Sequence, residues 1–178
     1  MYYGIINFAI YISALLIVFP LVKKNSECQK LMHISKEHIF LQLSIGFALA
    51  LILVLVLGII NIAFFRSFAV FQFLKLSAST KVNFFVFQLL VAITEELLFR
   101  GYLLANFIKI TKSTLLSAFI TSVLFGLTHF LINHNTVQLI IAFSISLLFS
   151  ITLINSKKCS IYSLILAHLL YDLAIINV

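Results

Sequence analysis

The sequence is poor in charge, and poorest in negative charge. Its 178 residues include five Asp and Glu against twelve Lys and Arg, and charged residues make up 10% of the chain. An average soluble domain has roughly 25% charged residues, and the mean hydropathy here is +1.20. The composition therefore excludes an ordinary soluble protein and predicts an integral membrane protein of all-α class.

Several residue types and motifs that define common proteases are also missing. The chain has a single aspartate, Asp172, which excludes a membrane aspartyl dyad. It has neither an H-E-x-x-H zinc helix nor a G-x-S-x-G nucleophile elbow. Its two cysteines, Cys28 and Cys159, fall in loops predicted to be cytoplasmic or at a helix end, which argues against a disulfide.

Long apolar runs are what the chain does have. Residues 1–22, 39–65 and 113–156 are free of Asp, Glu, Lys and Arg, and about 20 apolar residues suffice for a helix to cross the hydrocarbon core. The last run is long enough for two spans, and two more appear once buried charges are accepted. We predict six transmembrane helices, at residues 3–22, 39–60, 82–108, 114–132, 137–154 and 160–176.

The first run lacks a basic n-region and ends at Pro20 and two lysines, so we interpret it as a retained helix rather than a signal peptide. Residues 61–81 are interrupted by polar groups, and an interfacial amphipathic helix or an extension of the second span are equally open. We divide the chain into N-terminal helices with this segment, residues 1–81, and a C-terminal core, residues 82–178.

The basic residues lie in short loops rather than on a soluble face, so the formal charge of +7 does not indicate a nucleic-acid partner. We expect the protein to lie in the lipid bilayer, with no nucleic-acid partner. By the positive-inside rule, the lysine-rich loops after the first, third and fifth spans are cytoplasmic and both termini are outside. Those loops hold Lys23, Lys24, Lys30, Lys36, Lys109, Lys112, Lys157 and Lys158, whereas the loops after the second and fourth spans hold Arg66, Lys75 and Lys81.

Six ionisable residues interrupt the apolar segments and form the candidate site. An ionised carboxylate at membrane depth costs at least a few kcal/mol, so it persists mainly with a partner in a polar cavity. Counted along the helices, Glu95, His129 and Asp172 all lie about 21 Å from the lysine-rich side, so we expect them at one level. The six are Glu95, Glu96, Arg100, His129, His168 and Asp172.

The spacing within each helix suggests roles. Glu96 and Arg100 are four residues apart and share a helix face, so we expect a structural ion pair. Glu95 points about 100° away, has no partner on its own helix, and is the candidate general base. Water activation by Glu95 with His129 remains open, as does a metal held by His129, His168 and a carboxylate, Glu95 or Asp172. A self-contained hydrogen bond is the simpler interpretation of His168 and Asp172.

Three spaced motifs resemble a known family. Glu95-Glu96-x-x-x-Arg100, Phe125-x-x-x-His129 and His168-x-x-x-Asp172 are similar to the three motifs of the CAAX-protease and bacteriocin-processing (CPBP) intramembrane peptidases, also called the abortive-infection family. The resemblance covers about residues 82–176. It implies that Glu95 is the catalytic glutamate, that His129 is its water-holding partner, and that His168 and Asp172 face the oxyanion.

The resemblance also leads to expectations about cofactor, substrate and pathway. Such peptidases are often described as metalloproteases, although relatives that trim prenylated proteins look glutamate-dependent. We therefore expect no required cofactor, with a divalent metal such as zinc as the alternative. Asp172 replaces the Asn of those relatives, and an ionised Asp cannot donate a hydrogen bond to an oxyanion.

We expect an intramembrane endopeptidase acting on a peptide or membrane protein, in bacteriocin processing or self-immunity. A non-catalytic immunity or scaffold protein is the alternative. A proton-coupled transporter would require an internal repeat or broken helices, and the sequence shows neither.

Overall fold

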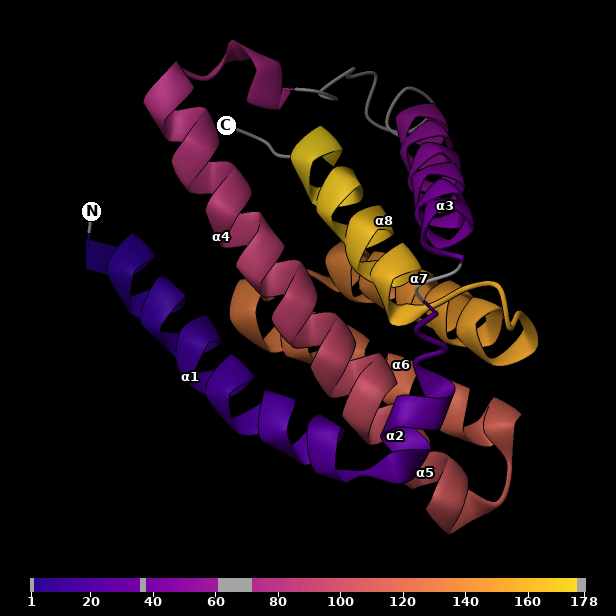
Figure 1. Ribbon diagram of the computed structural model, residues 1–178. Helices are drawn as coiled ribbons and strands as arrows, with labels where there is room; N and C mark the ends of the chain where they lie inside the picture. Colours follow the sequence, from indigo (N-terminus) through magenta and orange to yellow (C-terminus); the bar gives the residue numbers. More distant parts are fainter. Residues whose placement is uncertain (1, 36–37, 61–71, 176–178) are drawn as a thin grey trace.

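The computed structural model describes residues 2–35, 38–60 and 72–175, and this part of the chain is entirely helical (Figure 1). The elements are α1 (Tyr2–Lys24), α2 (Ser26–Leu31), α3 (Ile39–Ile60), the short 3₁₀ helix η2 (Gln72–Lys75), α4 (Ala78–Glu96), η3 (Leu97–Leu103), α5 (Leu104–Thr111), α6 (Thr114–Asn133), α7 (Thr136–Asn155) and α8 (Ile161–Ile175).

The predicted membrane fold is confirmed. Five segments are long and apolar enough to cross a bilayer, and α4, η3 and α5 together form one of them, Ala78–Thr111, with 34 residues. The sixth predicted span forms α8, which has only 15 described residues. At 1.5 Å per residue, that length is shorter than the hydrocarbon core. The segment predicted at 61–81 lies partly outside the described residues, and α4 begins within it, where the Ser77 hydroxyl accepts from the Thr80 amide.

Helix α8 lies at the centre of the molecule, between α3 and α4 (Figure 1). It is joined to α3 by direct backbone contact, because a Cβ atom on Gly46 would lie 2.5 Å from the Ser163 carbonyl oxygen. The Ser163 hydroxyl donates to the Gln42 carbonyl at 2.6 Å. Where α8 begins, the Ile161 amide donates to the Met32 carbonyl at 3.0 Å. These contacts fix the position of the helix that carries the third motif.

Helices α6 and α7 form a tightly packed antiparallel hairpin. Gly126 allows this close approach, since a Cβ atom there would lie 2.9 Å from the Leu139 carbonyl oxygen. The α6–α7 turn lies at the end of the helices opposite the lysine-bearing connections. Those connections lie together, because α2 contacts α5 and the α7–α8 loop contacts the chain at Met32.

Both cysteines are free and fully buried at the lysine-rich end. Burial raises the pKa of the Cys159 thiol to about 11. At neutral pH this thiol is therefore protonated and unreactive.

Two glycines of α3 provide a matched test of the α3–α8 contact. Gly46→Ala should destabilise the protein by about 1–3 kcal/mol, because the added methyl group meets the backbone of α8 rather than a movable side chain. Gly58→Ala places its methyl group where no described atom lies within 4 Å, so it should not destabilise. Thermal unfolding of both variants in the same detergent measures the difference, and equal melting temperatures would show that the helices do not touch at Gly46.

Candidate active site

The helix that carries the first motif changes its winding at the motif itself. Residues Leu97–Leu103 are π-helical, between the regular turns of α4 and α5. Short π-helical segments inside α-helices are rare and occur frequently at functional sites. Glu95 and Glu96 end the regular part, and Arg100 lies inside the widened part. Sequence periodicity did not predict this change.

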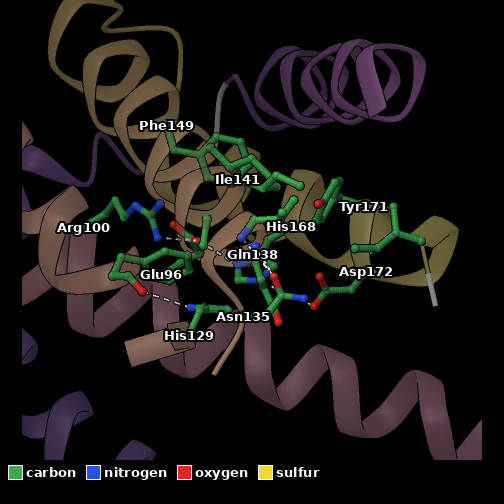
Figure 2. Close-up of a pocket in the computed structure, with 15 residues that line it drawn as sticks. Glu96, Arg100, His129, Asn135, Gln138, Ile141, Phe149, His168, Tyr171 and Asp172 are labelled. Atoms are coloured by element: carbon green, nitrogen blue, oxygen red, sulfur yellow. Dashed lines mark hydrogen bonds and ion pairs between the residues drawn. The ribbon is translucent and has the colours of Figure 1, made fainter. Parts of the chain in front are cut away.

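Glu96 is fully buried, and one of its carboxylate oxygens accepts two hydrogen bonds. Its Oε1 accepts from Arg100 Nη1 at 2.9 Å and from His168 Nδ1 at 2.8 Å (Figure 2). The first contact is the i, i+4 pair predicted from the sequence. The second was not predicted, and it ties α4 to α8.

Arg100 is fully buried between two aromatic rings. Its guanidinium carbon lies 4.7 Å from the ring centroid of Phe125 on α6 and 5.4 Å from that of Phe149 on α7. Both distances allow a cation–π attraction. Of its nitrogens, Nε and Nη2 have no hydrogen-bond partner among the described residues. Arg100 therefore joins three helices and retains unused donors.

His168 contacts all three carboxylates of the cluster. Its Nδ1 bonds Glu96, while its Nε2 lies 3.5 Å from Asp172 Oδ2 and 3.8 Å from Glu95 Oε2. The self-contained His168–Asp172 bond considered from the sequence is therefore wrong. The distances at Nε2 are too long for strong hydrogen bonds, so these are mainly electrostatic contacts.

Glu95 has a partner that sequence reasoning missed. The hydroxyl of Tyr11, on α1, donates to Glu95 Oε1 at 2.7 Å, and Glu95 Oε2 is buried without a hydrogen-bond partner in the described part of the chain. Glu95 indeed has no partner on its own helix, but it is not isolated. Nothing in the sequence marked Tyr11, because a contact across 84 positions depends on how α1 packs against α4.

His129 approaches the cluster from α6. Its Nδ1 lies 3.0 Å from the Phe125 carbonyl oxygen, and because a carbonyl only accepts, Nδ1 carries the proton. Its ring lies against that of Phe125, with the centroids 4.6 Å apart. In the neutral ring Nε2 then has a free lone pair. His129 makes no direct contact with Glu95 among the described residues, so the shared water expected from the sequence stays a prediction.

A cavity of about 410 Å³ joins most of these groups. Five of the six predicted site residues line it, namely Glu96, Arg100, His129, His168 and Asp172 (Figure 2). Glu95 does not, because it faces α1. The rest of the wall is mainly apolar, and it includes Asn135 in the α6–α7 turn and Val137 and Gln138 in the first turn of α7. Asn135 and Val137 are exposed, so this part of the wall reaches the surface near the turn.

The donor set does not fit a metal ion. A structural or catalytic zinc needs three or more converging protein ligands, and no such group of His, Cys, Asp and Glu exists among residues 2–35, 38–60 and 72–175. Nδ1 of His168 bonds Glu96 and Nδ1 of His129 bonds a carbonyl, so each ring keeps only Nε2 for a ligand. The alternative ligand set of His129, His168 and Glu95 or Asp172 is therefore not assembled.

Residues 77–174, more than half of the chain and including all three motifs, match the family described as Type II CAAX prenyl endopeptidase Rce1-like. The chain belongs to this family. The resemblance drawn from the three motifs is thereby confirmed, and membership suggests an intramembrane protease with a peptide substrate. No curated protein and no solved structure matches the chain.

The buried pair of this family member should stabilise far more than its exposed pair. Arg100→Ala leaves the Glu96 carboxylate buried beside His168 alone and should cost about 3–5 kcal/mol of unfolding free energy. As the control, Lys30→Ala removes the solvent-exposed pair with Glu27 and should cost at most about 1 kcal/mol. Thermal unfolding in detergent measures both. An unchanged melting temperature for Arg100→Ala together with loss of peptide cleavage would assign Arg100 to the substrate site instead.

Proposed function

We propose that this protein is an intramembrane endopeptidase that hydrolyses a peptide bond with a water molecule activated by glutamate, without a metal. The observation that carries the proposal is the buried cluster itself. Three carboxylates surround His168 beside a cavity within the membrane-spanning helices. Burying ionisable groups at membrane depth costs free energy, and such groups commonly mark functional sites.

In the proposed reaction Glu95 is the general base. Its Oε2 has no hydrogen-bond partner among the described residues and lies 3.8 Å from Nε2 of His168, which lines the cavity. A water molecule that reaches Oε2 past His168 gives its proton to Glu95, and the hydroxide attacks the carbonyl carbon of the peptide bond. When the tetrahedral intermediate collapses, the C–N bond breaks and the proton passes to the leaving amine.

The other cavity residues supply binding and charge stabilisation. Arg100 lines the cavity, and its Nε and Nη2 have no partner in the part of the chain that the structure describes, so it can donate to the oxyanion of the intermediate. His129 offers a free Nε2 lone pair for holding water. Asp172 lies 3.5 Å from His168 Nε2, and as a carboxylate it cannot donate to an oxyanion. We assign it the orientation of His168, and Glu96 the structural support of Arg100 and His168.

The direction of the cavity indicates where substrate comes from. It opens near the α6–α7 turn, and α6 leads away from the lysine-rich end for 20 residues. With the lysine-rich loops in the cytoplasm, the cavity opens toward the outer side. We therefore propose as substrates peptides or membrane-protein segments that are reached from outside, in bacteriocin processing or self-immunity.

Cysteines introduced one at a time test this orientation. Both native cysteines are fully buried, so the parent protein should give little background labelling. Lys157→Cys at the lysine-rich end should be protected from an impermeant maleimide in intact cells, whereas His134→Cys in the exposed α6–α7 turn should react. Permeabilised cells, in which both variants should react, are the control. The reverse pattern in intact cells would invert the membrane orientation.

The catalytic proposal is tested by Glu95→Gln. This change keeps the size of the side chain and the possibility of a bond with Tyr11, but it removes the proton acceptor. Purified wild-type protein should cleave members of a quenched fluorescent peptide library in detergent micelles. The variant should lose at least about 100-fold in kcat, in line with the usual contribution of a general base, and should unfold at nearly the same temperature.

The same assay separates the alternatives. Wild-type activity should survive a strong chelator, because no described metal-ligand set exists. Stoichiometric zinc in the active protein, with loss of activity on chelation, would contradict the metal-free reaction. Full protection of cells against a bacteriocin by Glu95→Gln would favour a non-catalytic immunity protein.

A further inference from the structure

Helix α1 lies outside the residues that match the family, 77–174, and yet it contacts the candidate site. It runs along the side of α4 (Figure 1). The contact is made at Tyr11, whose hydroxyl donates to Glu95 Oε1 at 2.7 Å. Thus the hydrogen bond to Glu95 Oε1 comes from the N-terminal part of the chain, outside the residues that match the family.

The surroundings of Tyr11 hold its ring in place independently of the hydroxyl. The ring packs edge-on against Phe87 of α4, with the centroids 5.8 Å apart. The Tyr11 carbonyl oxygen lies 3.5 Å from the Thr94 hydroxyl, a contact at the limit of a hydrogen bond. Removal of the hydroxyl alone should therefore leave α1 packed against α4.

The hydrogen bond makes the two oxygens of Glu95 unequal. Oε1 is fixed by a donor, and a bond from a hydroxyl to a carboxylate is roughly twice as strong as one between neutral groups. Oε2 is buried, has no partner in the described part of the chain, and lies closest to His168. Without Tyr11 the carboxylate could rotate about its last bond, and neither oxygen would be held toward His168.

We propose that Tyr11 is a positioning residue that holds Glu95 with Oε2 directed at His168 and the reacting water. The proposal rests on the proposed function of Glu95 as general base. It assigns α1 a part in the reaction that the three motifs do not include. Tyr11 itself does not touch the reacting atoms, so its effect should appear in turnover rather than in substrate binding.

A chemical probe tests the contact without any substrate. Dicyclohexylcarbodiimide enters membranes and modifies carboxyl groups, and mass spectrometry of the digested protein locates the adduct. Tyr11→Phe should increase the labelling of Glu95 by about threefold or more, because a carboxyl oxygen is released from a charge-assisted bond. Labelling of Glu96, which keeps both of its donors, should not change.

The matched control is Tyr162→Phe, which removes a hydroxyl from a tyrosine of α8 that is 40% exposed. It should leave the labelling of both glutamates and the activity at the wild-type level. If Tyr11→Phe also leaves Glu95 labelling unchanged, the contact is not made in the membrane protein and the proposal is overturned.

Cleavage of the quenched peptides tests the functional part. Tyr11→Phe should lower kcat about tenfold, the equivalent of one such hydrogen bond, with KM within about twofold and an unchanged melting temperature. An unchanged kcat, or a loss of kcat that only follows a loss of folded protein, would overturn the positioning role. If labelling responds as expected but wild-type protein cleaves no peptide, the proposed function fails while the Tyr11–Glu95 contact stands.

Discussion

The Glu96 carboxylate is the group on which the rest of the site depends. A charge without access to water is tolerated only when its partners compensate for the lost hydration. Glu96 Oε1 receives both Arg100 and His168, at 2.9 and 2.8 Å. Because Arg100 is on the same helix and His168 is on α8, one oxygen atom sets the level of α8 relative to α4. The α3–α8 contact at Gly46 then supports that level from the other side.

Arg100 extends this constraint to the remaining helices. Its guanidinium lies against Phe125 of α6 and Phe149 of α7, so the α6–α7 hairpin is packed directly on the charged pair. The side chain emerges from the π-helical segment, which changes its direction relative to a regular helix. From this irregular turn Arg100 reaches Glu96 and fits between the two rings. The stability of the bundle and the shape of the cavity therefore depend on the same residues.

Counting residues along the helices predicted one level for Glu95, His129 and Asp172. In the structure Glu95 and Asp172 both approach Nε2 of His168, at 3.8 and 3.5 Å. The i, i+4 rule also gave the Glu96–Arg100 pair, because that contact is local. The Glu96–His168 and Tyr11–Glu95 contacts depend on how each helix is rotated about its axis. A single sequence contains no direct signal for that rotation. Apolar residues occupy all faces of these helices, so their pattern does not show which face is buried.

The two adjacent glutamates face different neighbours, and this difference underlies the separate roles that we propose for them. Side chains about 100° apart on a helix face different neighbours, so Glu96 faces α8 and the cavity while Glu95 faces α1. The glutamate exposed to the cavity already has two donors on one oxygen, and using it as a base would weaken the pair that holds the helices together. The glutamate with a free, buried oxygen does not line the cavity. His168 contacts both glutamates, so its ring lies between the cavity and Glu95 and links Glu96 to the proposed general base.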